Sequence, residues 1–346
     1  MGDETMRSTV KSVAGRSLLV ALAAAWLGAA PPPAWSTEGP TSSQIERAMQ
    51  ATVGILKHVQ ESPSPAQGAR FSVRGSGFHL RDGYIVTARH AVKRRKGGRI
   101  IIPKTITVVT RDLEELPAAL IGVNAFVDLA VYRLSLGTGG ESLTSLSFSP
   151  REPEPGEQTF TIGYPLRWGP VVAFGRVGNS NIYLPTARSR LFQIDLSSCS
   201  GNSGGAVFNA QGEIVGMVQA IIQTERAEEE RRCSRFAFAV PGLLIQRIAT
   251  ALIAGQRPGF STLGLRLTAV KLGSRWRTAV SKATGPAREG GIRKGDVLLT
   301  IDDTPITDSA QLKTYLIEQT VPGQRVAIRV RRGETEHLLY VTLGSS

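Results

Sequence analysis

The clearest chemical signal in the sequence is a serine enclosed by glycines, in the segment Gly201-Asn202-Ser203-Gly204-Gly205. A nucleophilic serine needs an exposed hydroxyl on a turn whose backbone N–H groups converge on the developing oxyanion. Glycine at 201 permits the positive φ that can direct its N–H toward that oxygen, and the two later glycines leave the approach to the hydroxyl open. The pattern favours a catalytic serine at Ser203. The alternative is a glycine-rich turn that only connects two strands.

A catalytic serine needs a base, and the chain contains four histidines. They are His58, His79, His90 and His337. His90 follows an apolar run at the end of a predicted strand, where a side chain can face a cleft, and Asp128 heads the apolar segment Asp128-Leu129-Ala130-Val131. Taken alone, the first residue would be a structural histidine and the second a strand-end cap. Their joint occurrence in the order His, Asp, Ser predicts a catalytic triad.

The beginning of the chain indicates export. Lys11 and Arg16 precede the apolar run Leu18–Ala30, which Pro31–Pro33 end. This run is shorter than the roughly 20 residues needed to span a bilayer. We therefore expect a secretory signal peptide over residues 1–36 and a periplasmic or extracellular protein. The alternatives are an uncleaved anchor and a buried helix.

The chain is basic, with a net charge of +13. A basic chain can bind nucleic acid, but an exported one seldom meets it and no nucleic-acid motif is present, so no such partner is expected. The densest cluster of cations runs from Lys93 to Arg99. It is either a solvated loop or a contact with an anionic membrane or cell-wall surface. We expect no metal and no cofactor, because there is no His-Glu-x-x-His motif, no Cys/His cluster and no P-loop.

The spacing of apolar runs predicts two domains. Short runs recur between turn signals from residue 74 to about 240, which favours an all-β barrel or sandwich. A helix over 242–254 and a stop at Gly255 close this first domain, which we place at 41–255. A linker at 256–260 leads to a second module at 261–346, in which strands surround a helix at 309–319 capped by Asp308.

Several motifs together resemble the trypsin-like proteases of the HtrA (Deg) family. They are Gly75-Ser76-Gly77-Phe78, Thr87-Ala88-Arg89-His90, Asp128-Leu129-Ala130-Val131, Gly201–Gly205 and Asp195, eight residues before the serine. The resemblance implies a mainly β, two-barrel trypsin-like domain. It also implies that His90 takes the Ser203 proton and that Asp128 orients the imidazole. The backbone of Gly201, Asn202 and Ser203 would form the oxyanion hole.

The sequence departs from that family beside the serine. Cys199-Ser200 stands where the family usually has Asn-Pro. A cysteine four residues before the nucleophile is typical of chymotrypsin-like secreted proteases, which implies a disulfide between Cys199 and Cys233; the alternative is two free thiols. Asn202 replaces the aspartate that pairs with a newly cut N-terminal amine in many digestive proteases, so we expect control by loop ordering and not by propeptide removal.

Alignment on the serine also assigns a specificity pocket. Ser197 would lie at its base and Ile221 on a wall. Since neither residue is a carboxylate, we expect cleavage after aliphatic or other apolar residues and not after Lys or Arg.

The second module resembles a PDZ domain, an α+β fold. The motifs are Leu263-Gly264-Leu265-Arg266-Leu267 and the segment from Gly291 to Leu298. PDZ domains bind peptide C-termini by strand addition. Here Leu263, Gly264 and Leu265 would hold the carboxylate, with Leu312 or Leu316 in the groove. The alternative is a spacer that packs on the protease.

The resemblance further implies a homotrimer, with unfolded or misfolded polypeptides as substrates. A catalytically silent peptide-binding or chaperone protein on the same scaffold is the alternative function.

Overall fold

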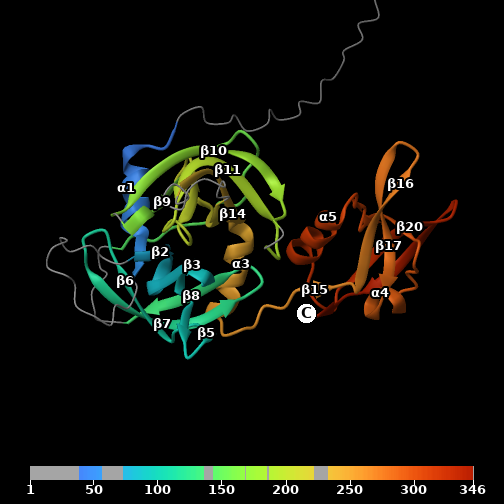
Figure 1. The fold of residues 1–346 in the computed structure, drawn as a ribbon, viewed down its shortest axis with the longest axis horizontal. Helices are drawn as coiled ribbons and strands as arrows, with labels where there is room; N and C mark the ends of the chain where they lie inside the picture. Colours follow the sequence, from blue (N-terminus) through green and yellow to red (C-terminus); the bar gives the residue numbers. More distant parts are fainter. Residues whose placement is uncertain are drawn as a thin grey trace, which may run out of the picture. The chain divides into compact units, whose positions relative to one another are not determined.

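The computed structural model describes residues 39–56, 73–135, 143–167, 169–184, 187–221 and 233–345. The signal peptide expected over 1–36 lies outside these residues. The described chain is mainly β and contains two closed six-stranded barrels and a separate α+β module (Figure 1). The predicted fold class is therefore confirmed.

The first barrel is built from the segment that contains the histidine and aspartate motifs. Around the barrel its strands are β1 (Thr52–Leu56), β2 (Val73–His79), β3 (Tyr84–Ala88), β8 (Leu129–Leu134), β7 (Glu115–Asn124) and β6 (Thr105–Val109). Val53, Ile55, Ile85, Leu116 and Tyr132 fill its interior and are almost wholly buried. Side chains that point inward from neighbouring strands form one core, and this burial drives the barrel to close.

The second barrel contains the serine motif. Its strands, in order, are β10 (Val171–Ile182), β11 (Leu191–Cys199), β14 (Cys233–Pro241), β13 (Ile214–Ile221), β12 (Ala206–Asn209) and β9 (Gln158–Gly163). Alternation along β11 buries Ile194, Leu196 and Ser198 and exposes Asp195 and Ser197, the period of two expected of a strand with one buried face.

Helices connect and cover the barrels. α3 (Gly242–Ile253) packs against β13 of the second barrel and against β7 and β8 of the first, so it contacts both barrels. Its buried apolar side chains are Leu244, Ile245, Ile248 and Leu252. Helix α1 (Ser42–Ala51) precedes β1. No helix in the described part of the chain is long and apolar enough to cross a membrane.

The start of helix α1 differs from the capping box that the segment Ser43-Gln44-Ile45-Glu46 predicts. Ser43 and Glu46 match a capping box in sequence, but the α1 N-cap is Thr41, whose side chain accepts the Gln44 N–H at 3.3 Å while the Gln44 side chain accepts the Thr41 N–H at 2.6 Å. The reciprocal pair forms two residues earlier because Thr41 has the extended backbone that an N-cap requires.

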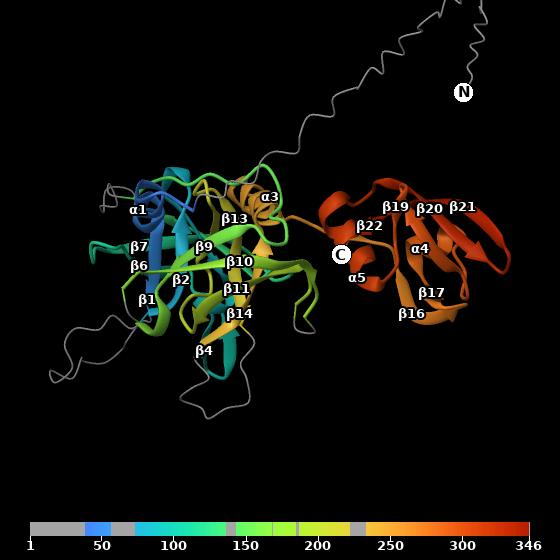
Figure 2. The same ribbon diagram turned by 90° about the horizontal axis from the view of Figure 1, so that it is seen from above.

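The C-terminal module is a sheet with helices beside it (Figure 2). Its strands are β16 (Leu265–Leu272), β17 (Arg275–Ala283), β18 (Val297–Ile301), β20 (Arg325–Arg332) and β21 (Thr335–Thr342), with β19 (Thr304–Pro305) beside β18, and a separate pair β15 (Ser261–Thr262) and β22 (Gly344–Ser345). The helices are α4 (Gly285–Glu289) and α5 (Ser309–Thr314), which continues as a π-helical turn over Tyr315–Gln319. Asp308 caps α5 as expected, accepting the Ala310 and Gln311 N–H groups.

His79 is held as a structural histidine at the end of β2. Its Nε2 accepts the Gly83 N–H at 3.2 Å, so its Nδ1 carries the proton and donates to the Thr144 carbonyl at 3.0 Å. Burial lowers the pKa of His79, against the smaller raising effects of the Thr144 carbonyl and of Asp82. The imidazole is therefore kept neutral by its surroundings.

This burial predicts that the domain formed by the two barrels is acid-sensitive. Because the folded pKa of His79 lies below its ordinary value of 6.5, the unfolded state binds more protons as the pH falls through that value. The contribution of His79 to the free energy of unfolding is therefore complete above about pH 6.5. Below that pH it is lost, by up to about 1.4 kcal/mol per pH unit. Urea unfolding of the Ser203→Ala protein between pH 7.5 and pH 5 measures this slope. His79→Gln should flatten it and the control His337→Gln should not, and equal slopes for all three proteins would refute the assignment.

Candidate active site

Strand pairing brings His90 and Asp128 together. β3 and β8 are antiparallel neighbours in which Ala88 lies opposite Leu129. His90 follows β3 in the short helix α2 (Arg89–Val92), and Asp128 immediately precedes β8. The Arg89 N–H donates to the Asp128 carbonyl at 2.7 Å, and His90 Nδ1 forms a hydrogen bond with Asp128 Oδ2.

The exposure of the two side chains suits an orienting role for the carboxylate. The Asp128 side chain is 15% exposed, whereas that of His90 is 38% exposed. A buried carboxylate that accepts from Nδ1 fixes the imidazole tautomer and leaves Nε2 as the proton acceptor.

The turn with Ser203 meets the first barrel at Gly75 and Ser76. The Ser76 N–H donates to the Ser203 carbonyl at 2.8 Å. A Cβ on Gly75 would lie 2.6 Å from the Ala91 Cβ and 3.0 Å from the Ser203 carbonyl oxygen. Gly75 therefore occupies the narrow space between the helix with His90 and the serine turn, and only a glycine fits there. Within the described residues the Ser203 hydroxyl makes no hydrogen bond.

The serine turn leaves two backbone donors free. The Asn202 N–H donates to the Cys199 carbonyl at 3.0 Å and the Gly204 N–H to the Val218 carbonyl at 2.8 Å. Among the described residues the N–H groups of Gly201 and Ser203 have no acceptor. Gly201 has φ 109°, and a Cβ there would lie 2.2 Å from the Tyr164 carbonyl oxygen. These two free N–H groups are the donors that an oxyanion needs, whereas the Asn202 N–H is used within the turn.

Ser76 is a positioning residue that the sequence reasoning missed. It is fully buried, and its Oγ donates to the Gly201 carbonyl at 2.7 Å and accepts the Tyr164 N–H at 2.9 Å. One hydroxyl of the first barrel thus holds the peptide beside the candidate oxyanion hole. The segment Gly75–Phe78 was recognised only as a family motif, and nothing in its spacing showed that its serine reaches a turn 125 residues away.

Cys199 and Cys233 form a disulfide between the paired strands β11 and β14. The bridge closes a loop with a sequence separation of 34, for which the chain-entropy model gives a stabilisation of about 4 kcal/mol. The Asn202 side chain is buried and donates to Ser198 Oγ at 3.4 Å. The bridge and the amide thus both lie at the base of the serine turn.

The specificity-pocket assignment stays a prediction. Ser197 is exposed on β11, next to the fully buried Ser198. Ile221 ends β13 and pairs with Ala237 of β14.

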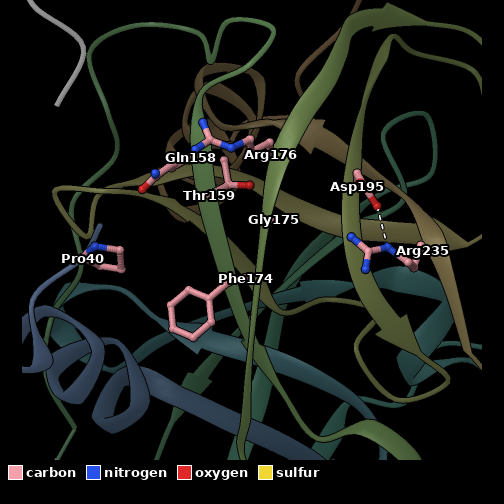
Figure 3. Close-up of a pocket in the computed structure, with 8 residues that line it drawn as sticks. All are labelled: Pro40, Gln158, Thr159, Phe174, Gly175, Arg176, Asp195 and Arg235. Atoms are coloured by element: carbon pink, nitrogen blue, oxygen red, sulfur yellow. Dashed lines mark hydrogen bonds and ion pairs between the residues drawn. The ribbon is translucent and has the colours of Figure 1, made fainter. Parts of the chain in front are cut away.

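Asp195 lies in a separate surface pocket on the outer face of the second barrel (Figure 3). Pro40, Gln158, Thr159, Phe174, Gly175, Arg176, Asp195 and Arg235 line it. Asp195 accepts from Arg235 at 2.8 Å, and this hydrogen bond lowers the pKa of the Asp195 carboxyl. No member of the predicted triad lines this pocket.

The candidate peptide groove of the C-terminal module lies at the edge of its sheet. β16 is an edge strand, so one side of its backbone can pair with an added strand. Leu263, Leu312 and Leu316 are buried in one cluster, against which Leu265 and Leu267 pack partly exposed. The N–H groups of Leu263 and Gly264 have no acceptor among the described residues. Leu267, which the sequence assignment omitted, packs against the same cluster.

Comparisons with known proteins identify both domains. Residues 75–217 match the trypsin-like peptidase domain family and residues 261–343 the PDZ domain family. The chain is 26% identical over 318 residues to a probable periplasmic serine endoprotease, DegP-like, of Marinomonas sp., covering 88% of this chain and 64% of that one. It is 26% identical over 316 residues to the serine endoprotease DegS of Escherichia coli, covering 86% and 84%.

Solved structures give the same result. The HtrA-type protease AlgW with tripeptide superposes with a TM-score of 0.69 at 25% identity, covering 89% of this chain and 98% of that one. The serine endoprotease from Yersinia pestis gives a TM-score of 0.59 at 26% identity, covering 89% and 100%. The chain therefore combines a trypsin-like peptidase domain with a PDZ domain. It is an HtrA-like serine endopeptidase by class.

The contacts of Ser76 predict a specific catalytic defect. Ser76→Ala leaves the Gly201 carbonyl and the Tyr164 N–H without partners, so the turn shifts. We expect kcat to fall about tenfold to hundredfold with KM within about twofold, and stability to fall by about 1–3 kcal/mol. Peptide cleavage and urea unfolding measure the two effects.

Ser149→Ala is the matched control. Ser149 is also buried, but its hydroxyl bonds only to the backbone of Arg151. It should lose stability and keep kcat. An equal loss of kcat in both variants would mean that Ser76 acts through stability alone.

Proposed function

We propose that the chain is an exported endopeptidase that hydrolyses peptide bonds in unfolded or misfolded proteins through His90, Asp128 and Ser203. The observation that carries the proposal is the His90–Asp128 hydrogen bond beside a serine turn with two free backbone donors. Relatives that are periplasmic serine endoproteases support the location. The class of substrate follows from the family resemblance. Self-association as a trimer follows from the family resemblance alone and is a prediction.

In the proposed reaction His90 Nε2 takes the Ser203 hydroxyl proton as the oxygen attacks the substrate carbonyl. Asp128 stabilises the resulting imidazolium through its hydrogen bond to Nδ1. The Gly201 and Ser203 N–H groups donate to the tetrahedral oxyanion. The imidazolium then protonates the leaving amine, and water hydrolyses the acyl-enzyme by the same route in reverse. His90 and Ser203 must first come within hydrogen-bonding distance, which is consistent with control by loop ordering.

The PDZ domain is proposed to bind the C-termini of substrates or regulatory peptides. An added peptide strand would pair with β16, its last side chain would contact the cluster of Leu265, Leu267, Leu312 and Leu316, and its carboxylate would accept from the N–H groups of Leu263 and Gly264. The HtrA-type protease AlgW was solved with a tripeptide, which supports peptide binding by proteins of this kind.

The triad is tested by covalent labelling and by digestion of unfolded casein. The wild type should react with a fluorophosphonate and digest casein. Ser203→Ala should do neither, and Asp128→Asn should lower kcat about ten-thousandfold because the imidazole loses its tautomer. Ser200→Ala is the matched control, since Ser200 is an exposed serine of the same turn, and it should be labelled like the wild type. A wild type that is neither labelled nor active, with or without PDZ-binding peptides, would identify a catalytically silent peptide-binding protein.

The PDZ assignment predicts a requirement for a free carboxylate. A peptide with an apolar C-terminal residue should bind the Ser203→Ala protein at least about tenfold more tightly than its C-terminal amide, because the amide removes a charged acceptor. Fluorescence anisotropy measures both. Leu267→Ser should weaken the binding of the peptide with a free carboxylate. The control Leu338→Ser, on the opposite edge strand β21, should leave that binding unchanged. Equal binding of acid and amide would exclude carboxylate capture.

A further inference from the structure

A basic hairpin that belongs to neither barrel follows the helix with His90. It consists of β4 (Arg94–Lys96) and β5 (Arg99–Ile101), joined by Gly97 and Gly98. Both glycines have positive φ, 54° and 75°, and neither has an atom within 4 Å of its Cβ position. β5 lies at the margin of the protease domain in Figure 1 and β4 in Figure 2. The tip is therefore uncovered by the rest of the described chain.

The hairpin concentrates positive charge. Lys93, Arg94, Arg95, Lys96 and Arg99 contribute five cations, and the segment 93–101 contains no acidic residue. Within the described residues none of these five side chains forms an ion pair. The charges of such a segment repel one another, and a negatively charged partner relieves that repulsion.

Two isoleucines interrupt the cations. Ile100 is 61% exposed and Ile101 is 37% exposed. Ile100 lies opposite Arg95 and Ile101 opposite Arg94, so each isoleucine shares a face of the hairpin with an arginine. Single exposed apolar residues are common on proteins, but adjacent isoleucines on both faces of a basic hairpin present apolar surface on either side of the tip.

We propose that this hairpin docks on an anionic lipid surface. The isoleucines would enter the boundary between headgroups and acyl chains, and the cations would pair with lipid phosphates, the combination that holds amphipathic segments at a membrane surface. An acidic peptide would satisfy the cations but would leave isoleucines exposed on whichever face it did not cover. A lipid surface can surround the tip of the hairpin and so contact the isoleucines and cations on both of its faces.

Docking would also fix which side of the protease faces the membrane. α2 ends at Val92 and β4 begins at Arg94, so the hairpin follows the helix with His90 almost directly. The catalytic side would be held near the lipid, where it could meet polypeptides at the membrane surface. The proposal goes beyond proteolysis and does not depend on it.

Vesicle flotation of the exported chain, residues 37–346, tests the proposal. The protein should bind vesicles of equal phosphatidylglycerol and phosphatidylcholine and not vesicles of phosphatidylcholine alone. Binding should be lost between 50 and 500 mM NaCl, a readout that needs no variant. The triple variant Arg95→Gln, Lys96→Gln, Arg99→Gln should bind about a hundredfold more weakly, since each cation near an anionic surface contributes about fivefold.

Two further variants separate the apolar contribution from net charge. Ile100→Ser with Ile101→Ser should weaken binding about tenfold or more at unchanged charge. The control Lys104→Gln, Arg257→Gln, Arg288→Gln removes the same charge from exposed positions elsewhere and should bind nearly as the wild type does. Thermal melting verifies that each variant is folded.

Three results would overturn the proposal. The first is equal loss of binding in the control and the hairpin triple variant, which would indicate net charge alone. The second is wild-type vesicle binding by the hairpin variants with loss of cleavage of acidic peptides, which would make the hairpin a substrate contact. The third is loss of binding in Trp276→Ser while the hairpin variants still bind, because Trp276, 65% exposed opposite Lys271, is the competing interfacial residue.

Discussion

The candidate active site depends on one contact between the two barrels, made by Ser76. Its N–H binds the Ser203 carbonyl and its hydroxyl binds the Gly201 carbonyl, so two carbonyls of the serine turn are fixed by one residue of β2. The histidine and aspartate belong to the first barrel and the serine to the second. The packing of α3 against both barrels and the contacts of β1, β2 and β3 with strands of the second barrel also set their separation. Hydrogen bonds in a buried junction are strong and directional, which is why they can fix a turn.

Close packing makes this contact possible and limits the residues that can form it. Gly75 leaves no room for a side chain between Ala91 and the Ser203 carbonyl, and Gly201 leaves none beside Tyr164. The disulfide then ties β11 to β14 at the base of the same turn. The turn is thus held on one side by the first barrel and on the other by its own barrel, while its hydroxyl and two N–H groups are left for a substrate.

The elements with unpaired backbone groups or exposed cationic and apolar side chains, which a partner could bind, lie outside the barrels. In closed barrels every strand edge is paired, so these domains offer few backbone groups to a partner. The PDZ sheet presents β16 as an edge, and the β4–β5 hairpin presents cations and isoleucines. The two closed barrels thus hold the candidate catalytic residues, while β16 and the β4–β5 hairpin are the elements suited to binding polypeptides and surfaces.

Local patterns in the sequence predicted an all-β first domain, either barrel or sandwich, and a second module, because alternating apolar residues, turn signals and caps act over a few positions. The family resemblance, and not the spacing, implied two barrels and a PDZ domain. The His-Asp-Ser order and the family motifs singled out His90, Asp128 and Ser203, and the resemblance suggested the partner of Cys199. Tertiary structure alone decided that Ser76 reaches Gly201, that Leu267 packs against the cluster with Leu312 and Leu316, and that the basic run after His90 is a hairpin with exposed isoleucines. These depend on which segments meet after the barrels close. Burial and backbone contact between residues more than 100 positions apart leave no periodic mark in the chain.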